Sequence, residues 1–344
     1  MARRVSIRDV AAAAGVSVTT VSHVLNRVDG TRVSPQTRER VEGAARRLGY
    51  AANGLARGLR LQRSQTLGLL SDRIATTPYA GRIILGAQET ASKHGLVLLL
   101  LHTGDDPRVE QREIRALAQH RVDGVLYATM YHRRVELPAE LRGQPVVLLD
   151  ASSADDTVPS VVPDERAGAA AAVGELLRHG HRRIGFCTNR DDIPATTGRL
   201  AGYRDALAGA GQPYREDLIV VEESDTAGGH RAARRLLDST DRPTALFCFN
   251  DRMAMGAYRA AAELGLRIPE DLSVVGFDNQ EIIAEGLHPG LTTMALPHYE
   301  MGAWAVQTMV ELLARPADAP PQPAAHVVMP CPLIRRASVA PAPG

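Results

Sequence analysis

Polar side chains follow several apolar runs in the long body of this sequence. Asp150 ends PVVLLD, Asn250 and Asp251 follow TALFCF, and Asp278 ends LSVVGFD. Arg199 opens a helical pattern after RIGFC and its loop. Carboxylates accept hydroxyl protons, an amide donates and accepts, and a guanidinium donates in a fixed fork. Together these groups have the chemistry to bind a polyhydroxylated small molecule.

These residues also have structural interpretations. Asp251 is better explained as the N-cap of the helix RMAMGAYRAA than as a ligand contact. Asp278 could cap a helix, and Arg199 could form a salt bridge. Asp150 could cap a turn, and the residues alone favour neither interpretation for it.

Short helices are predicted at the amino terminus, in SIRDVAAAAGVSVTTVSHVLN. Ser6 with Asp9 predicts a capping box at the start of the first helix, and Gly15 predicts its end. Ser17 predicts the N-cap of the second helix. A third helix is predicted to begin at Ser34-Pro35. Its predicted buried stripe is Val41, Ala44, Ala45 and Leu48.

The second of these helices is polar on the side away from the predicted core. Val21, Val24 and Leu25 face inward at helical spacing. The side chains left for the outer face, together with the N-cap, are Ser17, Val18, Thr19, Thr20, Ser22, His23 and Asn26. Small polar side chains in this position can approach base edges in the major groove. The pattern predicts DNA binding, and a protein-binding three-helix module is the alternative.

The segment Asn53 to Leu59 is a short helix candidate between this head and the body. A helix of this length does not persist alone in water, where about 12–15 residues are marginal. Arg57 and Arg60 can meet phosphates, and Leu59 is apolar on an otherwise exposed connector. The functional interpretation is a hinge that orders on DNA, with Leu59 as a wedge in the minor groove. An ordinary interdomain linker is the alternative.

The charge of the chain is uneven. Residues 1–63 contain 12 arginines and 4 acidic residues, which gives a net charge of +8. Because the whole chain of 344 residues carries +1, the remainder carries −7. A basic head on an acidic body fits nucleic-acid binding at one end only.

Composition and motifs argue against several other classes. Cys187, Cys248 and Cys331 form no metal-ligand spacing, and the first two end apolar runs, as buried free thiols would. The longest strongly apolar run, 96–101, is too short to span a membrane, and no export signal is evident. No phosphate-binding, nucleophile-elbow or zinc-protease motif is found. We therefore expect no enzyme, no catalytic residues, no metal, no cofactor, no membrane partner and a cytoplasmic location.

Short apolar runs alternate with helical patterns from residue 66 onward. Strand candidates are 66–70, 96–101, 123–127, 145–150, 183–187, 218–222, 244–249 and 272–278. Helix candidates are 81–94, 108–120, 164–179, 198–210, 227–238, 251–264 and 298–314. This alternation predicts an α/β body of two doubly wound halves, linked by 158–165, in which ligands bind beyond the carboxyl ends of the strands.

Several segments together resemble one family. The run IRDVAAAAGVSVTTVSHVLN, the helix SPQTRERV, the junction LGYAAN and the body motifs GHRRIGF, RPTALFCFND and GLRIPEDLSVVGFDN are similar to the lac and galactose repressor family of bacterial transcription regulators. The resemblance covers essentially the whole chain. It implies two Rossmann-like subdomains similar to periplasmic sugar-binding proteins. A sugar-transport component would need an export signal, and a sugar-isomerising or kinase-like enzyme would leave the basic head unexplained.

The resemblance also implies domain boundaries. The DNA-binding domain would span 1–50, the hinge 51–64 and the effector-binding and dimerisation domain 65–344. Within the last, one subdomain would comprise about 65–162 plus 293–323. The other would comprise about 163–292 plus 324–340.

By position, the resemblance assigns roles to individual residues. Val18, Thr19, Thr20 and His23 would face the major groove, and Asn26 would lie near phosphate. Leu59 would be the wedge, and Arg57 and Arg60 would hold the hinge helix. The implied effector-binding residues are Tyr79, Asp150, Arg199, Asn250 and Asp278.

The implied function is that of a homodimeric regulator, by family default a repressor, that binds double-stranded operator DNA and a small effector. Ile193, Ala195 and Ser224 stand where a purine-binding member of the family places polar, basic and aromatic contacts. A sugar or sugar derivative is therefore expected. The helices at 81–94 and 298–314 are candidates for the dimer surface. The alternative is a cytoplasmic sugar-binding protein without specific operator recognition.

Overall fold

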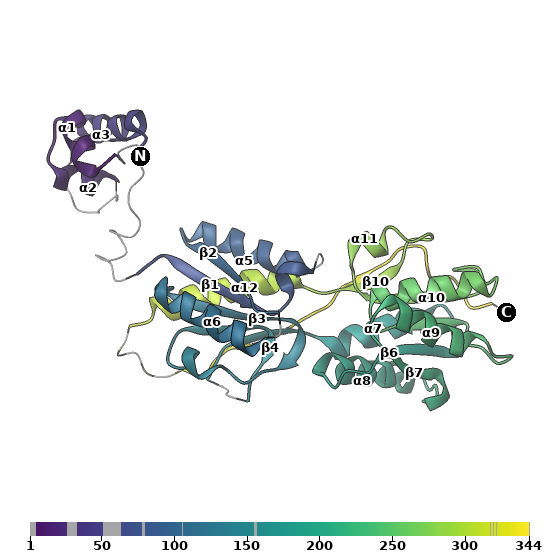
Figure 1. Ribbon diagram of the computed structural model, residues 1–344. Coiled ribbons are helices and arrows are strands. Elements are labelled where there is room, and N and C mark those ends of the chain that lie inside the picture. The colour runs from purple at the N-terminus through teal and green to yellow at the C-terminus, as the bar shows by residue number, and fades with distance from the viewer. Residues whose placement is uncertain are drawn as a thin grey trace. The chain divides into compact units, whose positions relative to one another are not determined.

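The computed structural model describes residues 5–25, 33–50, 63–77, 80–104, 106–154, 157–316, 318, 320 and 322–343. The chain divides into two compact units, residues 1–64 and 65–344 (Figure 1). Predictions for Asn26, Arg57, Leu59, Arg60 and Tyr79 lie outside the described residues.

The first unit contains three helices, α1 (Ile7–Ala14), α2 (Val18–Leu25) and α3 (Pro35–Leu48). The predicted capping box is confirmed, since Ser6 and Asp9 bond each other's backbone N–H, and Gly15 ends α1 at a φ of 62°. The helices share a small core of Val10, Ala11, Ala14, Val21, Val24, Val41, Ala44 and Ala45. The prediction that Leu48 is buried is wrong, because residues 46–49 at the end of α3 are all exposed.

The first half of the body is a parallel sheet in the order β11-β5-β4-β3-β1-β2. Its strands are β1 (Thr66–Ser71), β2 (Val97–His102), β3 (Gly124–Arg134), β4 (Val146–Ser152), β5 (Ser160–Pro163) and β11 (His326–Met329). Its helices are α5 (Gly81–Lys93), α6 (Pro107–Gln119) and α12 (His298–Ala314), with short turns η1 (Ile74–Thr76) and η3 (Ala139–Leu141).

The second half has the sheet order β12-β10-β9-β8-β6-β7, parallel except for the pair β10 and β12. Its strands are β6 (Ile184–Asn189), β7 (Ile219–Glu222), β8 (Ala245–Cys248), β9 (Ser273–Asp278), β10 (Thr292–Ala295) and β12 (Leu333–Ile334). Its helices are α7 (Glu165–Arg178), α8 (Pro194–Gly209), α9 (Thr226–Leu237), α10 (Asp251–Glu263) and α11 (Glu281–Ala284), with the turn η4 (Glu216–Leu218).

The eight predicted strands are present, and four short ones were missed. β5 lies in the segment interpreted as a linker, and β10, β11 and β12 have at most four residues each. The crossings between halves also differ from the expected boundaries. Thr292–Ala295 still pairs with β9 in the second sheet, and His326–Met329 pairs with β5 in the first. Strand pairing therefore places the crossings several residues later than expected.

Both faces of the central strands are buried, which explains their continuous apolar sequences. In β1, Leu67 and Leu69 join the core under α5 and α12, whereas Leu70 joins the core under α6. The predicted free thiols Cys187 and Cys248 are buried on neighbouring strands β6 and β8. None of the helices in the described ranges is both long and apolar enough to cross a membrane.

Two glycines let α5 and α12 approach closely. A Cβ atom at Gly302 would lie 2.2 Å from the carbonyl oxygen of Ile83, and one at Gly86 would lie 2.1 Å from that of Tyr299. These contacts are with backbone atoms, so a larger residue cannot be accommodated by a side-chain rotation. The spacing of the two helices therefore depends on glycine at both positions.

Gly302→Ala is expected to lower the free energy of unfolding by roughly 1–3 kcal/mol, because the added methyl group forces α5 and α12 apart. Gly209→Ala is the control, since its added Cβ has no atom within 4 Å apart from its chain neighbours and the backbone of its own helix. Urea unfolding of the whole chain measures both changes. Equal stability of the two variants would contradict the proposed close contact.

Candidate ligand-binding cleft and DNA-reading helix

A polar cleft lies where the carboxyl ends of the two sheets face each other. Its wall from the first sheet includes Met130, Tyr131 and His132 of β3 and Asp150 of β4. The wall from the second half includes Glu165, Asn189, Asp191, Arg199, Asn250 and Asp278. Of the five predicted effector-binding residues, Asp150, Arg199, Asn250 and Asp278 meet here. The cavity volume is only about 50 Å³.

Arg199 is the most tightly held charge in the cleft. Its Nε donates to Glu165 Oε2 at 2.6 Å, its Nη1 donates to the Phe249 carbonyl, and its Nη2 lies 3.4 Å from Asp278 Oδ1. The guanidinium carbon lies 4.4 Å from the ring centre of Phe249 and 3.7 Å from that of Phe277. Helix α8 begins at Pro194, four residues before the predicted start, so Arg199 lies inside the helix.

Asp278 ends β9 with a φ of 101°, a conformation that non-glycine residues rarely adopt. Burial raises the pKa of its carboxyl group from the ordinary value of 3.8 to about 6, although Arg199 and a hydrogen bond from Gln280 oppose the rise. Unusual backbone geometry and a perturbed pKa together are typical of functional sites.

Asp150 is fully buried and has a φ of 54°. Burial is the main reason that the pKa of its carboxyl group lies well above the ordinary value, and Glu165 and Asp278 raise it further while Arg199 lowers it. Its Oδ1 has no hydrogen-bond partner among the described residues. A buried acceptor without a partner costs about 1–3 kcal/mol, so this atom is a candidate for a ligand contact.

The interpretation of Asp251 as a helix N-cap is wrong, because Asn250 is the cap. Asn250 Oδ1 accepts from the Met253 N–H at 2.9 Å, and Nδ2 donates to the Ser224 carbonyl at 3.0 Å. Asp251 is the first residue of α10 and accepts from Gln280 N–H and from Thr293 Oγ1, each at 2.6 Å. Asp251 does not line the cleft.

Sequence reasoning missed Glu165, His132 and Arg252. Glu165 follows β5, which was interpreted as a linker, so its place at a strand end was hidden. His132 lies in a bulge of β3, where the register against β4 shifts between Ala128 and Arg133. Burial lowers the pKa of the His132 imidazole, and its Nδ1 has no partner among the described residues. No sequence signal marks a bulge of this kind.

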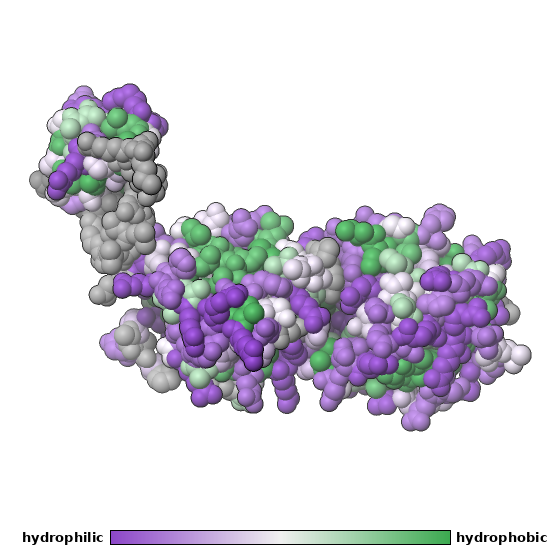
Figure 2. All heavy atoms as spheres, in the orientation of Figure 1, coloured by the Kyte–Doolittle hydropathy of each residue, from purple (hydrophilic) through white to green (hydrophobic). Residues whose placement is uncertain are grey.

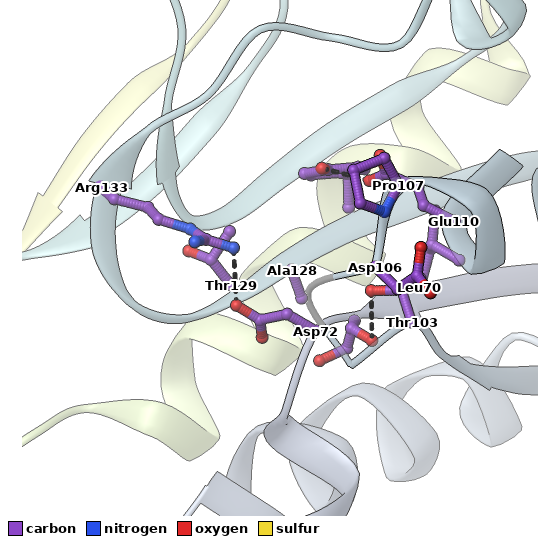
Figure 3. Close-up of a pocket in the computed structure, with 11 residues that line it drawn as sticks. Leu70, Asp72, Thr103, Asp106, Pro107, Glu110, Ala128, Thr129 and Arg133 are labelled. Atoms are coloured by element: carbon purple, nitrogen blue, oxygen red, sulfur yellow. Dashed lines mark hydrogen bonds and ion pairs between the residues drawn. The ribbon is translucent and has the colours of Figure 1, made fainter.

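A second cavity of about 250 Å³ lies at the carboxyl ends of β1, β2 and β3 and beside the start of α6 (Figure 3). Asp72 and Arg133 point toward each other across it and form an ion pair of 2.7 Å. Tyr127 donates to Glu110 at 2.6 Å. This cavity shares no lining residue with the cleft, and the β3 bulge contributes Thr129 and Arg133 to it.

In the first unit, α2 presents the predicted polar face. Ser17, Val18 and Thr19 are exposed, whereas Thr20, Ser22 and His23 are half-buried. The predicted N-cap is confirmed, because Ser17 Oγ accepts from the Thr20 N–H at 3.1 Å. The start of α2 therefore offers small side chains that are free to approach another surface.

Comparisons with known proteins match both units. A family model described as "Bacterial regulatory proteins, lacI family" matches residues 6–53. A second, described as "Periplasmic binding proteins and sugar binding domain of LacI family", matches residues 64–336. The predicted fold class, a helical head with two doubly wound halves, is confirmed.

Relatives of known name resemble the whole chain. The ribose operon repressor of Haemophilus influenzae is 33% identical over 317 residues, which cover 91% of this chain and 93% of the relative. The crystal structure of the lac repressor dimer bound to operator and the anti-inducer ONPF is 26% identical, with a TM-score of 0.80 over 98% of this chain and 100% of that chain. The complex of the transcriptional regulator CelR with cellobiose is 31% identical, with a TM-score of 0.69 over 97% and 100%.

Asp278→Asn is expected to remove a pH dependence of stability between about pH 4 and 6. Because the folded pKa of Asp278 is raised, its contribution to stability is fully present below the ordinary pKa and is lost as the pH rises through about 6. The free energy of unfolding of the wild type minus that of the variant should fall by about 1–3 kcal/mol over this range. Urea unfolding at a series of pH values measures the difference, and a difference independent of pH would contradict the assignment.

Proposed function

Because the chain belongs to the lacI family of bacterial regulatory proteins, we propose that it is an effector-responsive transcriptional repressor that binds a near-palindromic operator as a homodimer. One observation carries the proposal. A single chain combines a three-helix unit with an exposed polar helix start and a body with a polar cleft between two sheets. The proposal gives the chain no catalytic role, since its relatives are named as regulators, and it implies a cytoplasmic location.

Base reading is assigned to α2. Ser17, Val18 and Thr19 are exposed at its start, where a recognition helix contacts base edges. Thr20, Ser22 and His23 follow on the same helix as further contacts. Two copies related by a two-fold axis would read two half-sites of an operator. The proposed contacts from Asn26, Arg57, Leu59 and Arg60 belong to segments outside the described residues.

The dimer surface is assigned to the side of the body that carries α5, β2 and α11. Large apolar side chains are exposed there: Leu85 (48% exposed), Val97 (63%), Leu100 (38%) and Ile282 (80%). Figure 2 shows apolar surface over the region where Figure 1 draws α5 and β2. The other predicted candidate for the dimer surface is 298–314. The buried apolar side chains of α12 join the core of the first half, whereas Trp304, Val310 and Leu312 are only partly buried.

The effector is assigned to the cleft, and a sugar is the expected class. Two of the relatives have names that mention ribose and cellobiose, whereas several others are named PurR. A cavity of about 50 Å³ is far smaller than the roughly 300 Å³ or more of typical ligand pockets, so the two halves must separate to admit a ligand. An exposed ion pair of 3.2 Å between Arg82 on α5 and Glu281 on α11 joins the halves and would break or re-form in such a movement. A ligand that prefers one arrangement shifts the equilibrium between them.

Selection of genomic DNA fragments by the purified chain tests the proposal. The expected result is a recovered near-palindromic sequence whose affinity falls steeply with salt, because phosphate contacts release counterions. Binding that is salt-sensitive but recovers no common sequence would contradict specific operator recognition. Absence of DNA binding would leave the sugar-binding alternative.

Thr19→Ala is expected to cost about 1–3 kcal/mol of operator binding and to relax the preference at one base position per half-site. The reason is that Thr19 is exposed on the proposed reading face of α2. Gln36→Ala, at an exposed position of α3, is the control. Affinities for an operator and its single-base variants measure the effect. If the variant shows the same relative affinities for the single-base operator variants as the wild type, Thr19 does not contact a base.

Val97→Asp is expected to convert the dimer into a monomer and to weaken operator binding with it, because a charge on the edge strand β2 would be buried at the proposed interface. Val328→Asp is the matched control, since Val328 is 59% exposed on β11 at the opposite edge of the same sheet. Sedimentation velocity gives the mass of each variant. If Val328→Asp dissociates the dimer and Val97→Asp does not, the assigned surface is wrong.

A further inference from the structure

The cleft has an excess of acidic groups. Its described lining contains four carboxyl and two guanidinium groups: Asp150, Glu165, Asp191, Asp278, Arg199 and Arg252. Arg199 is already engaged by Glu165 and Asp278, and aromatic rings cover its guanidinium group. An anionic ligand would therefore add negative charge to an acidic site, where the further cation of the described lining is Arg252, whose Nε has no partner among the described residues.

Asp150 lies within this acidic lining. Its side chain is 1% exposed, and its Oδ1 has no hydrogen-bond partner in the described part of the chain. The charged groups around it are Glu165 on α7, Asp278 at the end of β9, Asp72 after β1 and Arg199 on α8. Three are carboxyl groups, of which Asp72 is paired with Arg133, and Arg199 is the positive group among the four.

The backbone fixes the position of this carboxyl group. Thr129 Oγ1 donates to the carbonyl oxygen of Asp150 at 2.6 Å and so ties the β3 bulge to the end of β4. Asp150 has a φ of 54°, a conformation that glycine adopts more readily than aspartate. The unpartnered oxygen is thus a preformed acceptor in the first half of the body, opposite the carboxyl groups of the second.

We propose that the effector carries a protonated amine on a polyhydroxylated ring, as in an amino sugar, and that the amine donates to Asp150 Oδ1. The proposal rests on the regulator function assigned above and names the class of its effector. A hydroxyl group could also donate to Asp150, but it would leave the surrounding negative charge uncompensated. A charged donor forms the stronger hydrogen bond and balances Glu165 and Asp278 at once.

The rest of the lining suits the hydroxyl groups of such a ring. Asn189, Asn250 and Ser224 offer uncharged donors and acceptors, and His132 presents an Nδ1 atom without a partner in the described residues. Arg252 lines both the cleft and an outer cavity of about 330 Å³ near Arg82 and Ile283. Among the described residues, Arg252 is thus the side chain that stands between the inner and the outer space.

The proposal couples binding to proton release. Without a cation beside it, the Asp150 carboxyl has a raised pKa and retains its proton to higher pH than an ordinary aspartate. A bound ammonium group lowers that pKa, so protons leave the site on binding and the affinity rises with pH. The ligand amine itself stays protonated near pH 6, since α-amino groups have pKa values of about 7.7–8.0.

Isothermal titration of the full chain with glucosamine, galactosamine and mannosamine tests this class. Each is compared with its parent hexose, its N-acetyl derivative and the hexose 6-phosphate at about pH 6.5. At least one amino sugar should bind at least about tenfold more tightly than each of its three counterparts. Titration in two buffers of different ionisation enthalpy should show proton release with the amine and none with the parent hexose.

Asp150→Asn should lower the affinity for that amino sugar by at least about tenfold and reduce the proton release, because the amide cannot ionise. The substitution keeps the shape of the protonated carboxyl group, so the urea unfolding midpoint should not fall. Asp192→Asn is the control, since Asp192 is exposed and does not line the cleft.

Failure of all three amino sugars to bind would overturn the proposal. So would a parent hexose or a 6-phosphate that binds as tightly as the amine. These outcomes are separate from the regulator function, which is tested by operator selection without any sugar. An amino sugar that binds a chain without operator recognition would refute the regulator and retain the cleft assignment.

Discussion

The cleft depends on the burial of one positive charge. Arg199 lies between the rings of Phe249 and Phe277 and bonds Glu165, Asp278 and a backbone carbonyl. Removing one partner of a buried ion pair costs about 3–5 kcal/mol, because the other charge is left without compensation. The arginine therefore holds α7, α8 and the ends of β8 and β9 in one arrangement. This makes the wall from the second half a rigid polar surface.

The opposite wall is built differently. Asp150 and His132 are placed by a bulge in β3 and a left-handed residue at the end of β4, and each has a polar atom without a partner among the described residues. In the wall from the second half, Arg252 Nε likewise has no partner among the described residues, whereas Arg199 is bonded to Glu165 and Asp278. A ligand that bonds Asp150 and His132 while resting on the Arg199 wall would tie the two halves together. Because the interaction differs between separated and joined halves, it can bias the conformation of the whole body.

Much of this arrangement could be predicted from the sequence, for physical reasons. Central strands of parallel sheets are apolar throughout, so runs such as LSVVGFD are recognisable. Asp150, Asn250 and Asp278, which follow such runs, line the cleft. The two-residue strand β12 carries no such pattern, and Glu165 was missed because β5 was not recognised. Asn250 and Asp251 are both good caps, and only the contacts of Asp251 with Gln280 and Thr293 decide between them. The β3 bulge that places His132 depends on tertiary pairing.

The central claim is that ligand binding in the cleft and operator binding by the head are coupled in one chain. Thermodynamic reciprocity tests it directly. For a ligand found by titration, its affinity is measured with and without saturating operator, and the operator affinity is measured with and without saturating ligand. The account predicts that the operator changes the ligand affinity, and the ligand changes the operator affinity, by the same factor. That factor should be larger or smaller than 1. A ligand that occupies the cleft, as shown by loss of binding in Asp150→Asn, yet leaves operator affinity unchanged would contradict it.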